Sequence, residues 1–109
     1  MAYDEGVAQR LRDVMQEIPG VEEKKMFGGL AFMVNGNMCA GVVKDTLMLR
    51  VGADQYKHAL ARPYARKMDF TGKPMTGLIY VDPPGFESDG DLENWIETAL
   101  AYVKNLPRK

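Results

Sequence analysis

Residue types that often carry catalysis or metal binding are scarce in this chain of 109 residues. It contains one cysteine, Cys39, and one histidine, His58. A single cysteine excludes an intrachain disulfide, and one residue of each type excludes a zinc site built from several Cys and His ligands. We therefore predict that the chain binds no metal or other cofactor. Because a lone free cysteine fits a reducing compartment, we also predict a cytoplasmic protein.

Long apolar runs and an excess of charge of either sign are also missing. No apolar run approaches the roughly 18 residues that a membrane-spanning helix needs. The N-terminus lacks the pattern of a signal peptide. The net charge is −1, and no nucleic-acid motif is present, so we do not expect direct binding to DNA or RNA. With 46% hydrophobic and 27% charged residues, the composition predicts one globular domain over residues 1–109.

Glycine-rich phosphate-binding motifs are absent as well. Gly28-Gly29 follows Met26-Phe27, but neither a GxGxxG pattern nor a P-loop surrounds the pair. The neighbouring residues predict strands on both sides rather than a strand and a helix. We therefore interpret the two glycines as a sharp bend between strands, which glycine permits without steric cost.

The stretch from 24 to 51 predicts an antiparallel meander. Asn35-Gly36-Asn37 is a strong hairpin signal, and Lys44-Asp45-Thr46 is a weaker one. Between these turns, apolar residues alternate with a period of two, which places them on one face of a sheet. The predicted apolar positions are Leu30, Phe32, Val34, Met38, Ala40, Val42, Leu47, Leu49 and Val51. Helices should cover that face, and Arg50 should lie on the less buried one.

Three helices and two further strands are predicted around the meander. Residues 4–18 show a helical apolar stripe with Asp4 as the N-cap, and Arg10 and Arg12 on the solvated face. A short helix is predicted over 53–61, and a last helix begins after Ser88 with capping-box spacing and carries Trp95. The strands are predicted over 67–70, at an edge, and over 75–81, before a proline-rich loop through residue 86.

Four segments of the chain resemble the TfoX/Sxy N-terminal domain family from about Val21 to Leu106. They are EKKMFGGLAFMVNGNMCAGVV, LMLRVG, ARPYARKMDFTGKPMTGLIYVDP and a Leu-x-x-Trp-Ile helix. The resemblance implies an α+β fold of the secretion-chaperone-like type. It would be a two-layer sandwich with an antiparallel sheet and helices on one side, in the order helix, three to four strands, helix, two strands, helix.

The same resemblance implies a regulatory role without catalysis. The namesakes of the family are regulators of competence genes that act with a transcription activator, and they carry a second, C-terminal domain that these 109 residues do not include. We therefore expect a protein-interaction module, related to transcription co-regulators, that binds a protein partner such as a transcription factor and forms a homodimer. The family supplies no catalytic residues to assign.

A basic segment is the candidate interaction surface. Residues 53–75 contain five basic and two acidic side chains, although the whole chain is slightly acidic. We predict that Arg62, Arg66, Lys67 and Lys73, together with Arg50, contribute to a surface for an acidic partner.

An alternative function is a small ligand-binding domain or an enzyme. Its pocket would lie near Cys39, Arg50 and His58, because a thiol, a guanidinium and an imidazole can together support nucleophilic chemistry. This alternative requires the three side chains to converge in one concave site.

Overall fold

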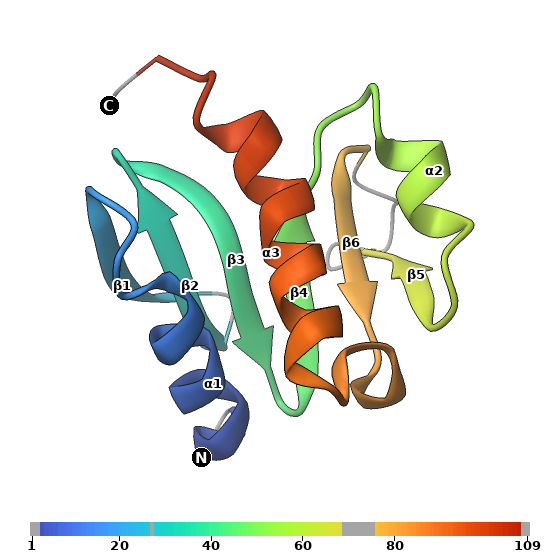
Figure 1. Cartoon of the computed structure of the whole chain (residues 1–109), viewed down its shortest axis with the longest axis horizontal. Helices are drawn as coiled ribbons and strands as arrows, with labels where there is room; N and C mark the ends of the chain where they lie inside the picture. Colours follow the sequence, from blue (N-terminus) through green and yellow to red (C-terminus); the bar gives the residue numbers. More distant parts are fainter. Residues whose placement is uncertain (1–2, 27, 69–75, 108–109) are drawn as a thin grey trace.

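A six-stranded antiparallel sheet and three α-helices form an α+β fold, as predicted (Figure 1). The computed structural model describes residues 3–26, 28–68 and 76–107. The elements are α1 (Glu5–Met15), β1 (Val21–Met26), β2 (Gly29–Val34), β3 (Asn37–Val43), β4 (Thr46–Arg50), α2 (Tyr56–Leu60), β5 (Ala65–Lys67), β6 (Leu78–Val81), the 3-10 helix η1 (Pro83–Phe86) and α3 (Asp89–Val103).

The strand order across the sheet is β1-β2-β3-β4-β6-β5. The first four strands form the predicted meander, and its hairpin turns carry left-handed residues at Asn35, Gly36 and Lys44. Gly28, with φ of 72°, provides the bend between β1 and β2, as expected for the glycine pair. Strands β1 and β5 are the outermost strands of the sheet.

Helices α1 and α3 lie on the same face of the sheet, with α3 crossing β3 and β4 (Figure 1). Between the helices and the sheet is one hydrophobic cluster, in which Leu11 and Met15 of α1 and Trp95 of α3 are buried. From the sheet it includes Leu30, Phe32, Val34, Cys39, Ala40, Val42, Leu47, Leu49, Val51, Ile79 and Val81. The apolar face predicted for the meander is confirmed at all of its positions except Met38.

Met38 lies on the opposite face because β3 contains a bulge. The pairing of β2 with β3 shifts by one residue, so that Phe32 pairs with Ala40 and Met33 pairs with Met38. The extra residue, Cys39, joins Ala40 in the hydrophobic cluster, whereas Met38 does not. A bulge adds a residue to one strand and so reverses the alternation beyond it. The period of two alone does not reveal this change.

Both long helices begin at the predicted caps. The Asp4 carboxylate accepts a hydrogen bond from the Val7 amide at 3.1 Å, and the Ser88 hydroxyl accepts one from the Asp91 amide at 3.0 Å. Arg10, predicted to be solvated, instead donates to the Phe86 carbonyl oxygen at 2.8 Å and joins α1 to η1. A side chain that satisfies a loop carbonyl in this way links two elements that are far apart in the sequence.

The second half of the chain differs from prediction in its boundaries. The edge strand is β5, which begins at Ala65, and the following strand begins at Leu78 rather than at 75. Residues 69–75, which include parts of both predictions, lie outside the described residues. The proline-rich segment is the 3-10 helix η1, anchored by Phe86, which is 1% exposed. Among the described residues, no helix has the length and apolar character to span a bilayer.

Candidate functional site

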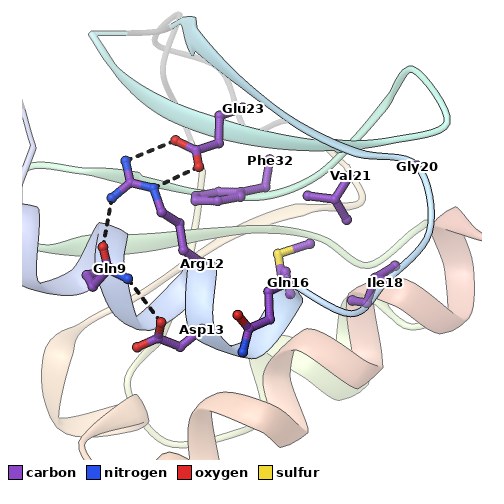
Figure 2. Close-up of a pocket in the computed structure, with 10 residues that line it drawn as sticks. Gln9, Arg12, Asp13, Gln16, Ile18, Gly20, Val21, Glu23 and Phe32 are labelled. Carbon is purple, nitrogen blue, oxygen red and sulfur yellow. Dashed lines mark hydrogen bonds and ion pairs between the residues drawn. The ribbon is translucent and has the colours of Figure 1, made fainter.

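The candidate site is a hollow of about 440 Å³ between α1 and β1, here called the α1–β1 hollow (Figure 2). The C-terminal half of α1, the following turn, and strands β1 and β2 form its walls. Its lining residues are Gln9, Arg12, Asp13, Met15, Gln16, Ile18, Gly20, Val21, Glu23 and Phe32. The hollow has a polar side and an apolar side.

The polar side is a chain of hydrogen bonds from α1 to β1. The Arg12 guanidinium donates to both oxygens of Glu23, with Nε–Oε2 and Nη2–Oε1 distances of 2.7 and 2.9 Å. Its Nη1 donates to Gln9 at 3.1 Å, and Gln9 donates to Asp13 at 3.0 Å. The bond to Glu23 raises the pKa of Arg12 above its usual value. Two parallel hydrogen bonds fix the guanidinium in a defined orientation.

The apolar side lies deeper in the hollow. Figure 2 shows Phe32, Val21 and Ile18 turned toward the same space, with the Arg12–Glu23 pair at one end. Phe32 and Met15 belong to the hydrophobic core and are almost fully buried, while Val21 and Ile18 are half-buried. An apolar side chain that enters the hollow therefore contacts the edge of the core itself.

The lining combines a polar rim with an apolar floor. Among the described residues that line it there is no cysteine, histidine, serine or tyrosine, and their one cation, Arg12, is paired with the Glu23 carboxylate. The Arg12 and Glu23 side chains are 34% and 37% exposed, so their pairing contributes only about 0.2–1 kcal/mol to stability. Its main effect is to hold the polar rim in place around an apolar floor.

Sequence reasoning missed this hollow because its walls come from separate elements. Arg12 and Glu23 are eleven residues apart and meet only after the turn at residues 16–20 reverses the chain. The only sign of this contact in the sequence is that Arg12 and Glu23, on either side of Pro19-Gly20, have opposite charges. That pattern is common, and it does not specify contact.

The predicted basic surface does not form one patch among the described residues. Arg66 donates to both carboxylate oxygens of Asp82 and stacks on Tyr80, so its charge is neutralised on the protein. Arg62 lies on Trp95, with Cζ 3.4 Å from the ring centroid, and burial lowers its pKa. Arg62 therefore contacts α3, whereas Arg66 packs along the sheet.

The other members of the predicted basic surface are also separate. The Arg50 guanidinium lies over the ring of Tyr102, 5.7 Å from its centroid, at the C-terminal end of α3. Arg50 is half-buried and, unlike Leu49 before it, lies outside the hydrophobic cluster, and at the end of β4 its guanidinium reaches a helix. Lys67 is exposed on β5, and Lys73 lies outside the described residues. The assignment of these five residues to an interaction surface stays a prediction.

Cys39, Arg50 and His58 line neither the α1–β1 hollow, nor the hollow between α2 and α3, nor the hollow beside Trp95. Cys39 is fully buried in the hydrophobic cluster, and burial raises the pKa of its thiol to about 12 although the charge of Arg50 acts in the opposite direction. His58 is exposed on α2, at the other end of the sheet. A thiol that stays protonated and has no access to solvent is a poor nucleophile.

We predict that Cys39 makes stability depend on pH in the alkaline range. The pKa of the thiol in the folded protein is raised from 9.0 to about 12. Its contribution to the free energy of unfolding is therefore complete below pH 9.0 and is lost as the pH rises toward 12. At about pH 10 the loss amounts to about 1.4 kcal/mol. Urea unfolding at about pH 8 and about pH 10 should show this excess loss in the wild type relative to Cys39→Ala. Equal losses in both proteins would contradict the burial of the thiol.

The comparisons with known proteins define the family. The family described as TfoX N-terminal domain matches residues 13–103, from the second half of α1 to the last residue of α3. The chain therefore belongs to the TfoX N-terminal domain family, as its resemblance predicted. A comparison with curated proteins finds no match.

Proposed function

We propose that this protein is a non-enzymatic interaction module that binds a protein partner through the α1–β1 hollow. The observation that carries the proposal is the combination of an apolar floor with a rim whose charged groups are already paired. Such a hollow accepts an apolar side chain of another protein and provides hydrogen-bonding groups around it, as the core and rim of a protein interface do. The partner therefore inserts an apolar or aromatic anchor next to Phe32.

Family membership supports a regulatory role for this protein and indicates the class of its partner. The chain belongs to a family whose name refers to a competence regulator, and we propose that the partner is part of the transcription apparatus, such as a transcription activator. The module then acts in the cytoplasm as a co-regulator. In this account, affinity for DNA comes from the partner. The two arginines of the basic segment, Arg62 and Arg66, stack on aromatic rings of this chain itself.

Gln16→Trp should abolish partner binding. Gln16 is exposed at the C-terminal end of α1 and lines the hollow, so a tryptophan there occupies the space that the partner's anchor needs. Affinity capture from the native cell extract, with tagged wild type and variant in parallel, measures the loss. We expect a transcription factor or polymerase component among the proteins that only the wild type retains.

The matched control is Gln55→Trp. Gln55 is also exposed and lines a different hollow, between the start of α2 and the end of α3. This variant should retain the partner, and both variants should match the wild type in urea unfolding to within about 0.5 kcal/mol. Retention of the same proteins by Gln16→Trp and by the wild type would refute docking in the α1–β1 hollow.

A further inference from the structure

Strand β1 leaves one edge of the sheet open. It is the outermost strand, and among the described residues no strand pairs with its outer edge (Figure 1). The strand has six residues, twice the length of β5 at the other edge, and residues 22–25 are all exposed. The free amide and carbonyl groups of such a strand can pair with another extended strand.

The order of charges along β1 selects the strand that fits. Glu22 and Glu23 occupy its first half, and Lys24 and Lys25 occupy its second half. Charged residues on an edge usually prevent pairing, because an arbitrary strand meets at least one like charge. In an antiparallel copy of β1, lysines can lie against glutamates, and only the residue on the two-fold axis meets a residue of its own kind. A parallel copy places like charges together.

We propose that two copies of the chain form a symmetric dimer by antiparallel pairing of their β1 strands, which joins the two sheets into one. A two-fold axis perpendicular to the sheet relates the copies, so one residue of β1 faces its own counterpart at the axis. With Glu23 at the axis, Glu22 of each copy faces Lys24 of the other. This dimer goes beyond the docking of a partner in the hollow and does not depend on it.

The neighbours of Glu23 favour this register. Glu23 faces its counterpart across the axis. In each copy, however, Arg12 already pairs with the Glu23 carboxylate of that same copy. The next register in which opposite charges meet has Lys24 at the axis, and the described structure shows no carboxylate paired with that lysine. Like charges directly opposite each other destabilise a strand pair, whereas opposite charges stabilise it.

The proposed dimer brings the two hollows together. Val21 and Glu23 lie on the helix side of β1, where Glu23 pairs with Phe32, and both residues line the α1–β1 hollow. Glu22 and Lys24 lie on the other face of the sheet, because successive residues of a strand alternate. Substitutions at these two positions therefore test the dimer without changing the lining of the hollow.

Charge exchange at Glu22 and Lys24 tests both the dimer and its register. Sedimentation equilibrium at low ionic strength should give a reversible dimer for the wild type. Glu22→Lys and Lys24→Glu should each raise the dissociation constant by about tenfold or more, because each places two pairs of like charges across the interface. The double variant Glu22→Lys/Lys24→Glu and an equal mixture of the two single variants should both restore the dimer to within about threefold of the wild type.

Glu97→Lys and Lys57→Glu are the controls. They make the same changes in net charge at exposed positions on α3 and α2, away from β1, and should leave the dissociation constant unchanged. A monomeric wild type at every concentration would overturn the proposal. A dimer that the single variants do not weaken, or that the double variant fails to restore, would overturn this interface. Each of these results leaves the capture experiment with Gln16→Trp intact.

Discussion

Gly29→Ala is expected to destabilise the fold by about 3 kcal/mol, because the new methyl group has no space. Gly29 is the first residue of β2 and is buried in the sheet. A Cβ atom there would collide with the carbonyl oxygen of Val42 on β3 and would lie 3.0 Å from a methyl group of Val43. The oxygen belongs to the backbone of a paired strand, so relief requires the strands to separate. Urea unfolding followed by far-UV circular dichroism measures the change.

Gly28→Ala is the matched control for this prediction. Gly28 has a left-handed backbone, with φ of 72°, but a Cβ atom at that position would meet nothing within 4 Å. The substitution should therefore cost only about 1 kcal/mol, which is the strain of an alanine in the left-handed region. A loss at Gly28 as large as the loss at Gly29 would show that backbone conformation, rather than close packing of β2 on β3, requires the glycine pair.

Trp95→Ala should cost about 3–5 kcal/mol, a large fraction of the stability of a domain of this size. The indole is 1% exposed between α3 and the sheet, and its Nε1 donates to the Gly85 carbonyl oxygen at 3.0 Å. Arg62 stacks on the outer face of the ring and donates to Thr98 at 3.2 Å. The substitution removes the packing, leaves the carbonyl oxygen of η1 without its donor, and leaves Arg62 without its ring.

Trp95→Phe separates these contributions. It keeps an aromatic ring for Arg62 and part of the packing, but it removes the hydrogen bond to Gly85. We expect a loss of about 1–2 kcal/mol, which is the usual cost of an unpaired polar group plus a small void. Circular dichroism is the appropriate probe, because Trp95 is the only tryptophan of the chain. Equal losses in the two variants would mean that the hydrogen bond alone accounts for the effect.

Local features of the fold were predictable from the sequence because their partners are close along the chain. The caps at Asp4 and Ser88 each bond to an amide three residues later, and the turn at 35–36 depends on residues that tolerate a left-handed backbone. The apolar alternation along β2 and β4 was equally informative, since each strand alternates independently of its neighbours.

Features that depend on distant partners were not predictable in this way. The bulge at Cys39 arises from the pairing of β3 with β2, and it moves Met38 to the other face of the sheet. The contact between Arg10 and Phe86 joins residues 76 positions apart. The basic segment predicts a surface for an acidic partner, but nothing local indicates that Arg62 and Arg66 stack on Trp95 and Tyr80.

The candidate site was the least predictable part of the protein. Its floor residue Phe32 was correctly assigned to the core, but an assignment to the core does not reveal which core residues adjoin an open hollow. The pairing of Arg12 with Glu23 also had no local signal. Both features depend on the packing of α1 against β1 and β2, which single-sequence patterns do not determine.

Methyl spectra of labelled methionines would test the central claim most directly. Met15 contributes to the α1–β1 hollow, whereas Met33, Met38 and Met48 are not among its lining residues and lie outside the hydrophobic cluster between helices and sheet. Addition of the protein that the wild type retains should shift the Met15 methyl resonance and leave those of Met33 and Met48 unchanged. Shifts at Met33 and Met48 with none at Met15 would contradict docking in the hollow and would place the partner on the opposite face of the sheet.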